Sequence, residues 1–390
     1  MRILKNFQEI LEIGKDCLEK RQKQKKPVIS DGIKKYPEQV NGPWEQSPEA
    51  LENTIKYIFD YLHHSCYMMC VVEGKPTMYK IINRETIPSI KKTLKRKSIS
   101  TKKTWRVLQC VLKEYSKQEV TSVEWDRFLN EVQFPLPDGV YILNLTDAVL
   151  LRKDGKDPWN LSLGTFQGSS KFLPILGGSS KVGYHDIPIP NYDDARIILG
   201  YDKLPEVETN WENKKPIAVF RGGSTGCGTT SETNMRIKLS NMKSESLDVG
   251  LVQVTNKMKF DPLKGLSLIK KSDVGMAGFL SMTEQSKYKY MIHVDGNVAA
   301  YRLLKTMLLK SVILKVEGEY LLWVDYLLKP WKHYVPVKAD LSDLEEMVKW
   351  CQDNDSKAKK IAEEGYKFAE KHLTKSYVMS TFAKILWKLY

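Results

Sequence analysis

Hydrophobic positions recur at helical spacing in the first third of the chain and again near its end. Residues 1–26, 48–70 and 102–131 carry apolar side chains roughly three or four positions apart, and we expect a helix in each. Ser342 and Glu345 form a Ser-x-x-Glu capping signature for a later helical region. That region has an expected buried face of Ala358, Ile361, Ala362, Gly365, Phe368 and Ala369. A terminal helix is expected from Thr374.

Between these helical ends, short apolar runs alternate with polar, glycine-containing turns. The runs that we expect to form strands are 138–145, 172–180, 214–223, 288–294 and 311–318. From residue 214 onwards the strands alternate with helix-like segments, a rhythm that is typical of a parallel sheet. The sequence therefore predicts an α/β protein.

The chain is too long for one ordinary core. At 390 residues, two domains are expected. A polar stretch containing proline precedes the strand that begins near residue 214, and we place the boundary there. The expected parts are an N-terminal domain at 1–208, a C-terminal domain at 209–373, and a terminal helix at 374–390 that packs back on the first domain.

Composition narrows the class of protein. Hydrophobic residues make up 42% of the chain, which indicates a globular protein. Every long apolar run is interrupted by charge, so we expect no membrane span. The N-terminal segment is too acidic for a secretory or transit peptide, the C-terminus is not KDEL-like, and the cysteines are scattered. We therefore expect a cytoplasmic location.

A cluster of histidine and cysteine raises the question of a zinc site. His63 and His64 lie just before Cys66 and Cys70 in HHSCYMMC. A second pair of ligands at matching spacing is missing, and the stretch is otherwise apolar. We favour buried structural cysteines, with a metal site as the alternative.

Basic residues are concentrated in two runs. The formal net charge is +14, and residues 20–26 and 91–103 hold much of the excess. Such runs suit a solvated surface, a nucleic acid, an anionic membrane or an acidic polymer. Aromatic residues for base stacking are sparse beside them, and no zinc finger, RRM signature or basic zipper accompanies either run.

Two strand-to-helix turns have the composition of an anion site. In YMIHVDGNVAAYR, a strand ends near Val294, and we expect a helix to begin near Val298 with Arg302 in its first turns. In AVFRGGSTG, an apolar strand leads into a loop with Ser224 and Thr225, followed by Arg236. Free backbone N–H groups and arginine forks are suited to phosphate oxygens. Because ligands bind at the carboxyl ends of parallel strands, the two turns together predict a site for a diphosphate. An ordinary βαβ unit with surface arginines is the alternative.

Polar side chains also follow strands in the earlier half. Asp147 comes directly after YILNLT, where a general base facing a cleft is expected to lie. His185 and Asp186 form a second polar cluster beside a glycine-rich turn. A turn or capping role for the aspartate, and a structural role for the histidine, are the alternatives.

These motifs together resemble a known family. The ordered series DGVYILNLTDAVL, YHDIPIP, FRGGSTG, KYKYMIHVDGNVAAYRLLKTMLLKSVILK and LKPWKHYVPVKADLSDLEEMVKW is similar to glycosyltransferase family 90, over roughly residues 135–385. The resemblance implies a GT-B-like fold with two Rossmann-like domains facing a central cleft. It also implies inverting transfer of glucose or xylose from a UDP-sugar to a hydroxyl of a glycan or protein. The cysteine-poor form is more similar to viral or microbial members.

The resemblance also implies roles for individual residues. Asp147 corresponds to the base, and His185 and Asp186 line the sugar side. The residues expected to contact the nucleotide and its diphosphate are Arg221, Ser224, Thr225, Arg236, Asp295, Gly296, Val298, Ala299, Ala300 and Arg302.

The expected chemistry needs no metal ion. The arginines would neutralise charge on the departing UDP, so a divalent metal is not expected, and no DxD-type motif clearly serves one. The expected partners are a UDP-sugar donor, UDP-glucose or UDP-xylose, and a glycan or protein acceptor, with no specific nucleic acid. The alternatives are a non-catalytic glycan-binding protein and a basic nucleic-acid-binding protein.

Overall fold

The computed structural model describes residues 2–4, 6–30, 32–61, 66–81, 118–156, 170–204, 206–207 and 209–390. The chain forms two compact units. Unit 1 consists of Met1–Leu199, Leu321–Tyr326 and Lys375–Tyr390, and unit 2 consists of Gly200–Tyr320 and Leu327–Thr374. The second basic run, 91–103, lies outside the described residues.

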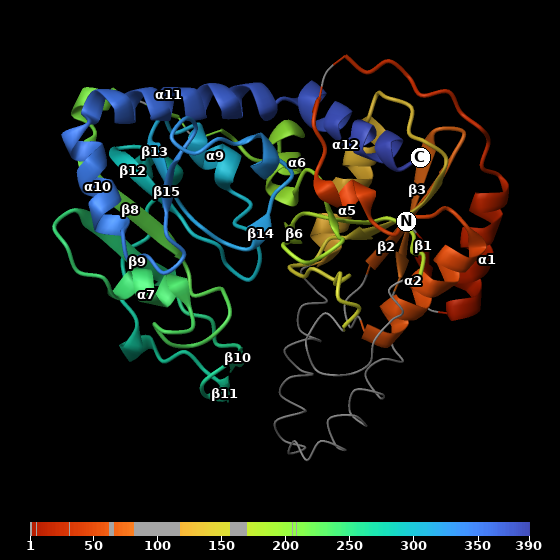
Figure 1. Ribbon diagram of the computed structural model, residues 1–390, viewed down its shortest axis with the longest axis horizontal. Helices are drawn as coiled ribbons and strands as arrows, with labels where there is room; N and C mark the ends of the chain where they lie inside the picture. The colour runs from red at the N-terminus through yellow and green to blue at the C-terminus, as the bar shows by residue number, and fades with distance from the viewer. Residues whose placement is uncertain are drawn as a thin grey trace. The chain divides into compact units, whose positions relative to one another are not determined.

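Unit 1 is built on a mixed six-stranded sheet (Figure 1). In spatial order its strands are β1 (Arg2–Leu4), β3 (Lys75–Ile81), β2 (Cys66–Val72), β4 (Gly139–Asn144), β5 (Ile175–Gly177) and β7 (Ile187–Pro188). Strand β2 runs antiparallel to both neighbours, whereas β1–β3, β4–β5 and β5–β7 are parallel pairs. The strands expected at 138–145 and 172–180 are therefore present, and the second is shorter than predicted.

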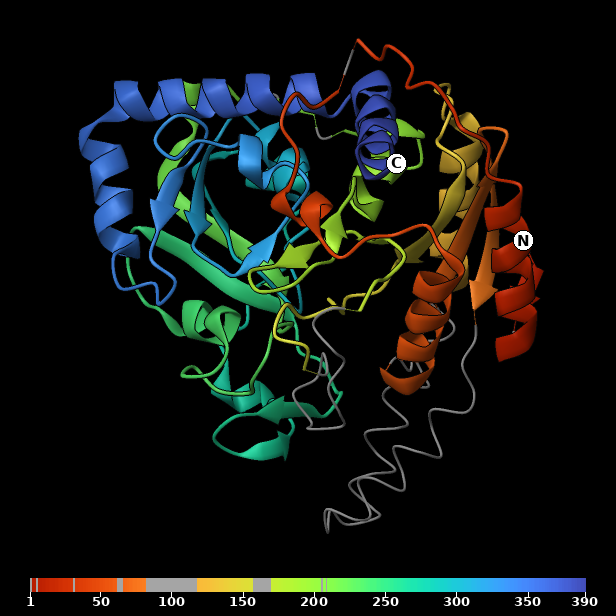
Figure 2. The same ribbon diagram turned by 45° about the vertical axis from the view of Figure 1, so that its right-hand side comes forward.

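Helices complete unit 1. They are α1 (Phe7–Glu19), α2 (Pro48–Tyr61), α5 (Gln118–Glu131), α6 (Tyr192–Ile198) and α12 (Lys375–Leu389), with the 3₁₀ turn η1 (Glu38–Asn41) and the short strand β6 (Ser180–Lys181). Helices α1 and α2 pack against each other, as the second view shows (Figure 2). Trp125 and Phe128 of α5 pack against Phe382 of α12, Phe128 in an edge-to-face contact, and all three are buried. The C-terminal helix is thus part of the aromatic core of unit 1.

The expected helix over 48–70 is wrong at its end. Helix α2 stops at Tyr61, and Cys66 begins strand β2. Every residue from Cys66 to Val71 is buried, and an apolar run of that kind suits a central strand covered on both faces better than a helix with one solvated side. Alternation places Cys66, Met68 and Cys70 in the cluster formed with α1 and α2.

The expectation of buried cysteines is confirmed. Cys66 and Cys70 are 1% and 5% exposed. Burial raises the pKa of the Cys66 thiol to about 12, so this thiol stays protonated. Within the described ranges there is no group of three or more metal-ligating side chains, while His63 and His64 lie outside them.

Unit 2 contains the predicted parallel sheet. Its spatial order is β15 (Val335–Val337), β13 (Val312–Val316), β12 (Tyr288–His293), β8 (Lys215–Gly223) and β9 (Leu247–Gln253), with every pair parallel. The chain adds β9 on one side of β8 and then crosses to β12 on the other. The direction of winding therefore reverses between β8 and β12, and the carboxyl ends of these strands are where an open α/β sheet forms a ligand site.

Short helices and a hairpin surround this sheet. They are η3 (Trp211–Asn213), α7 (Met235–Asn241), β10 (Lys259–Asp261), β11 (Gly265–Ser267), η4 (Lys271–Asp273), α8 (Met282–Gln285), α9 (Leu303–Met307), α10 (Leu344–Asp353) and α11 (Asp355–His372). The strand β14 (Tyr320–Leu321) and the turn η5 (Asp325–Leu327) lie where the chain passes between the units. Helix α11 runs beside α9 and β13 (Figure 1).

The helical pattern predicted for α11 is confirmed, but the cap predicted for the preceding helix, α10, is not. All six apolar positions expected on α11 are buried. The predicted capping box at Ser342 is wrong, because α10 begins at Leu344 and Asp343 occupies the cap position. The Asp343 carboxylate accepts from the backbone N–H of Lys338 instead, at 2.9 Å. None of the helices in the described ranges combines the length and hydrophobicity of a membrane-spanning helix.

A buried carboxyl group in unit 1 is expected to make stability depend on pH. Asp194 of α6 is 1% exposed, and it accepts a 2.7 Å hydrogen bond from Trp323 Nε1. Burial raises its pKa from 3.8 to about 7. As the pH rises through this window, the unfolded chain loses the proton first, so the free energy of unfolding falls by up to about 1.4 kcal/mol per pH unit. Asp186, whose pKa burial raises to about 6, acts in the same direction.

Asp194→Asn is therefore expected to reduce this loss of stability. Urea unfolding at about pH 5 and about pH 8 measures the change. The free energy of unfolding at about pH 8 relative to about pH 5 should be clearly less favourable in the wild-type chain than in the variant. The same change in both proteins would mean that Asp194 does not titrate in this range.

Candidate functional site

The connection after β12 differs from the expected strand–helix turn. Helix α9 begins at Leu303, not near Val298, and it is five residues long. Arg302 therefore occupies the cap position before the helix. The prediction that Arg302 lies in the first turns of a longer helix is wrong, and so is a cradle that depends on the free N–H groups of such a helix.

Asp295 explains why the helix starts late. Its Oδ1 accepts from the backbone N–H of Ala300 at 3.1 Å, and the N–H of Gly296 donates to the carbonyl of Val298 at 2.9 Å. These bonds hold 295–300 as a compact loop. Within this loop, the side chains of Val298, Ala299 and Ala300 are buried. The backbone of this segment is therefore a fixed wall of the site.

The loop after β8 is held by partners from elsewhere in the sequence. Ser224 N donates to Gln253 O at 2.9 Å, and Ser224 Oγ accepts from Thr255 N at 2.9 Å. Lys259, on the β10 strand, donates from Nζ to the carbonyls of Ser224 and Gly226, both at 2.6 Å. The glycine-rich loop is thus fastened to the end of β9 and to the β10–β11 hairpin.

Arg236 joins the two loops. Its Nη1 donates to Thr225 Oγ1 at 2.6 Å, its Nε to Asp295 O at 2.9 Å, and its Nη2 to Val294 O at 3.0 Å. The α7 cap Asn234 fixes the start of the helix that carries it, because Asn234 Oδ1 accepts from the N–H of Arg236 at 3.0 Å. The guanidinium therefore lies where the ends of β8 and β12 meet.

Arg302 approaches the same place from the other loop. Its Nη1 donates to the carbonyl of Arg221 at 2.9 Å. The guanidinium carbons of Arg302 and Arg236 lie 5.7 and 5.8 Å from the ring centroid of Phe220, which is 1% exposed. One buried ring thus supports two arginines through cation–π contacts. Two permanent charges converge at the reversal point between β8 and β12.

The surroundings of these arginines are strongly positive. Burial, together with Lys315, Arg302 and Arg236, holds the pKa of His293 well below its usual range, so this buried histidine is neutral. Burial lowers the pKa of Lys259 to about 8. The two permanently charged arginines add positive charge beside these buried groups, which suits this place to an anion.

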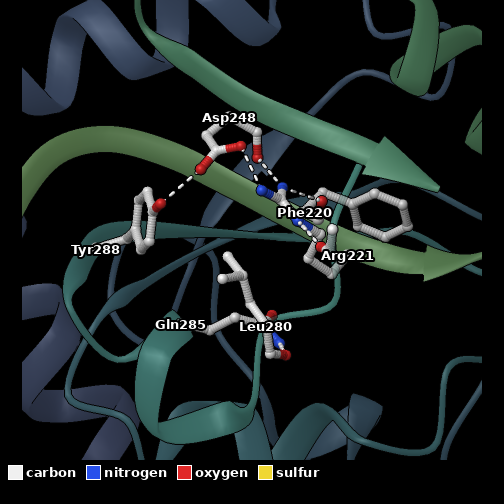
Figure 3. Close-up of polar contacts among 7 residues, drawn as sticks. Phe220, Arg221, Asp248, Leu280, Gln285 and Tyr288 are labelled. Carbon is white, nitrogen blue, oxygen red and sulfur yellow. Dashed lines mark hydrogen bonds and ion pairs between the residues drawn. The ribbon is translucent and has the colours of Figure 1, made fainter. Parts of the chain in front are cut away.

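Arg221 has different surroundings from the other two arginines (Figure 3). It is 8% exposed, and its donors reach Gly278 O at 2.9 Å, Asp248 O at 2.8 Å and Asp248 Oδ1 at 2.5 Å. Tyr288 donates to the other oxygen of Asp248. The guanidinium thereby links β8 to β9 and to the segment at Gly278. This is a structural role that the sequence did not indicate, and a nucleotide contact from Arg221 stays a prediction.

Asp147 lies in unit 1 on a bend after β4. Asn144, the last residue of β4, organises the bend: its amide donates to Ala148 O at 2.7 Å, and its Oδ1 accepts from Thr146 Oγ1 at 2.6 Å. Asp147 is exposed at the tip. The structure thus presents this carboxylate at the carboxyl end of a buried strand, as the sequence predicted for a base, while its catalytic role stays a prediction.

His185 and Asp186 separate into two environments. Asp186 is fully buried, and its two oxygens accept from Leu150 N at 2.8 Å and Leu151 N at 2.7 Å. Its carboxylate therefore secures the chain that follows the Asp147 bend. His185 is partly exposed and lies edge-on to Trp44, with centroids 6.1 Å apart. Sugar contacts by either residue stay a prediction, and His185 is the accessible one.

The candidate site also includes four residues that the sequence analysis did not select: Phe220, Asn234, Lys259 and Asn297. Asn297 Oδ1 accepts from the N–H of Gly226 at 2.9 Å, which connects the two loops. Strand alternation offered one signal: Arg221 and Phe220 must point to opposite faces of β8, so only one of them can lie under the arginines. The contacts of Lys259 come from a distant hairpin and carried no local signal.

Gly296 offers a direct test of this geometry. A Cβ at this position would lie 2.7 Å from Thr225 Oγ1 and 3.2 Å from Arg236 Nη2. Gly296→Ala is therefore expected to displace the Thr225–Arg236 pair and to weaken the affinity for UDP by roughly tenfold, with a small change in melting temperature. Titration calorimetry with UDP measures the affinity. Gly278→Ala is the matched control, since a Cβ there meets nothing within 4 Å.

Unit 2 is an open parallel sheet with two arginines at the reversal point of its winding, and sequence comparison identifies the family. The family model "Glycosyl transferase family 90" matches residues 166–389, more than half of the chain. The chain therefore belongs to glycosyl transferase family 90, as the sequence motifs indicated.

The chain is similar to viral and vertebrate proteins of greater length. It is 32% identical over 315 residues to Uncharacterized protein 179R of Invertebrate iridescent virus 6, covering 65% of this chain and 27% of that protein. It is 32% identical over 262 residues to human Protein O-glucosyltransferase 3, covering 65% of this chain and 47% of that protein. Protein O-glucosyltransferase 2 of Danio rerio is 30% identical, with 72% of this chain and 53% of that protein covered. The chain thus spans about a quarter to a half of these relatives.

Structural similarity to solved proteins is weak. Anabaena HepE in complex with UDP-glucose matches 45% of this chain and 48% of its own chain, at 13% identity and a TM-score of 0.29.

Proposed function

We propose that the chain is an active, inverting glycosyltransferase that moves glucose or xylose from a UDP-sugar to a hydroxyl group of a glycan or protein. The observation that carries the proposal is the convergence of Arg236 and Arg302 on Phe220 at the reversal point of the unit 2 sheet. Membership of the family and the names of the O-glucosyltransferase relatives support the same class of reaction. We further propose that units 1 and 2 are the two domains of a GT-B-type enzyme.

In the proposed reaction, unit 2 holds the leaving group. The two guanidinium groups bind the diphosphate as forked, permanently charged donors, and Thr225 completes the contact. As the bond between the anomeric carbon and the phosphate oxygen breaks, the electron pair leaves with UDP. Fixed positive charge stabilises the charge that develops there. Because the arginines supply that charge, we propose that no divalent metal is required.

Unit 1 supplies the base. The Asp147 carboxylate takes the proton from the acceptor hydroxyl while the oxygen forms its bond to the anomeric carbon. Attack from the face opposite to the departing UDP inverts the anomeric centre. The products are a glycosylated acceptor, UDP and a protonated Asp147, which returns its proton to solvent.

The choice between glucose and xylose depends on one hydroxymethyl group. Packing against one such group gives selectivity of only about 1–3 kcal/mol, so the donor must be measured directly. Release of UDP by the purified chain is followed with UDP-glucose, UDP-xylose and other UDP-sugars, with and without EDTA. We expect turnover of one of the first two donors that EDTA does not reduce.

Two results would contradict parts of this proposal. Turnover that EDTA abolishes would overturn the metal-independent mechanism but leave the transferase class intact. Absence of turnover, together with no effect of UDP on the melting temperature, would overturn the diphosphate site itself and favour a non-catalytic binding protein.

A further inference from the structure

A pocket in unit 2 has no part in the proposed reaction. It has a volume of about 630 Å³, within the usual range for ligand sites, and opens to solvent. It is lined by Trp331, Lys332, Trp350, Lys357, Lys360, Ile361 and Glu364. Two indoles and three ammonium groups therefore line one hollow.

This pocket lies at the other end of the sheet from the arginine site. Trp331 comes shortly before strand β15, so it lies near the amino end of that strand. At the start of α11, Asp355 accepts from Trp211 Nε1 at 3.0 Å and from Lys289 Nζ at 2.7 Å. These two partners lie at the beginnings of β8 and β12. Because Arg236 and Arg302 lie at the carboxyl ends of the same strands, the pocket is a separate site.

The two tryptophans form a corner. Their ring centroids are 4.8 Å apart, and their planes meet at 70°. Trp350 packs against the core of unit 2, whereas Trp331 is 46% exposed. Its loop is closed by bonds from Trp331 N to Tyr334 O at 2.7 Å and from His333 N to Lys329 O at 3.0 Å. Trp331 has a φ of 61°, a backbone conformation that is unfavourable for a bulky residue. The fold therefore keeps this partly exposed indole in place at a cost in conformational free energy.

The charged side chains that line the pocket are mostly positive. Glu364 pairs with Lys332 at 3.6 Å and with Lys367 at 3.2 Å, so its charge is already shared. Among the side chains that the structure describes, no ion pair involves Lys357 or Lys360, and both are exposed. Their ammonium groups therefore remain available to an anion beside the indoles.

We propose that this pocket binds an acidic saccharide. The negative face of an indole attracts the polarised C–H groups of a pyranose ring, and lysines attract the carboxylates or phosphates that such a sugar carries. A corner of two rings at 70° follows the puckered shape of a sugar better than that of a flat base, which stacks on one plane or between parallel planes. The site goes beyond the proposed transfer reaction and does not depend on it.

Titration calorimetry with a matched pair of ligands tests the proposal. One ligand is a hexasaccharide of galacturonic acid, and the other is the same hexasaccharide with its carboxylates reduced to hydroxymethyl groups. We expect the intact chain to bind the acidic form at least tenfold more tightly at low ionic strength, and this preference should shrink as salt is added.

Three variants separate the contributions. In Trp331→Asn the new residue tolerates the positive φ at this position, so the loop should keep its conformation. Binding of both ligands should fall at least tenfold, because the exposed indole is lost. Lys357→Ser with Lys360→Ser should remove the preference for the acidic form and leave binding of the neutral form unchanged. Lys243→Ser with Lys271→Ser removes two exposed lysines of unit 2 outside the pocket, and it should change neither affinity.

Several outcomes would overturn the proposal. They are absence of binding by the intact chain, an unchanged affinity in Trp331→Asn, and an equal loss in the control pair of lysine variants. Tighter binding of a single-stranded oligonucleotide of the same charge would assign the pocket to nucleic acid instead. If Trp331→Asn does not fold, as judged by its melting temperature, the two lysine pairs still decide the result.

Discussion

Asp147→Asn is expected to lower the rate of sugar transfer by about 10²–10⁴-fold while the affinity for UDP stays unchanged. The amide has nearly the shape of the carboxylate but cannot accept the proton of the acceptor hydroxyl. Asp147 is exposed on a bend that Asn144 organises through its own side chain, so the substitution should leave the fold intact. Transfer to acceptor and binding of UDP are measured separately on the same preparation.

The control for this experiment is Asp154→Asn. Asp154 is also an exposed aspartate of unit 1, and it pairs with Arg152 at the surface at 2.6 Å. Exposed pairs of this kind contribute little to stability, so the control should retain both transfer and UDP binding. Normal transfer by Asp147→Asn would show that the base is another residue. Loss of activity in both variants would point to a general effect of charge in unit 1.

Arg302→Ala is expected to weaken the affinity for UDP by about 10–100-fold. The loss corresponds to about 1.5–3 kcal/mol, the usual contribution of hydrogen bonds from a charged donor. Phe220 and the carbonyl of Arg221 position the Arg302 guanidinium, and the substitution removes both contacts together with the charge. Calorimetry with UDP, and with uridine as a ligand that lacks phosphate, measures the effect.

Uridine separates a phosphate contact from a structural one. If Arg302 binds the diphosphate, the variant should lose affinity for UDP and retain its weaker affinity for uridine. Arg302→Lys should recover part of the loss, because it keeps the charge but not the fork. A lower melting temperature with an unchanged affinity for UDP would instead assign Arg302 to the stability of unit 2.

The parallel sheet of unit 2 and the convergence of two arginines at its edge could be predicted from the sequence. Apolar runs separated by glycine-containing turns mark β8, β12 and β13, and these are local signals. The rule that ligands bind at the carboxyl ends of parallel strands then brings Thr225, Arg236 and Arg302 together. The strand β2 could not be distinguished from the end of helix α2, because a short, continuously apolar run suits either element.

Side-chain contacts that depend on the folded backbone could not be predicted. The late start of α9 depends on Asp295 accepting from Ala300, and this competes with a helical turn in a way that composition does not reveal. Asp343, and not Ser342, immediately precedes α10, and its carboxylate accepts from the N–H of Lys338 instead of capping the helix. The buried role of Arg221 depends on Asp248 in the neighbouring strand. In each case the deciding partner was identifiable only once the strands and loops were in place.

The division of unit 1 into three separate stretches has a consequence for how the chain is made. A ribosome releases Met1–Leu199 first, but the aromatic contacts of Trp125 and Phe128 with Phe382 cannot form until the final stretch has been synthesised. The whole of unit 2 emerges before that point, and its parallel sheet draws only on residues within its own stretches. Domains often fold in the order of their synthesis. In this chain, unit 2 is instead expected to complete its core first, because unit 1 lacks helix α12 until synthesis ends.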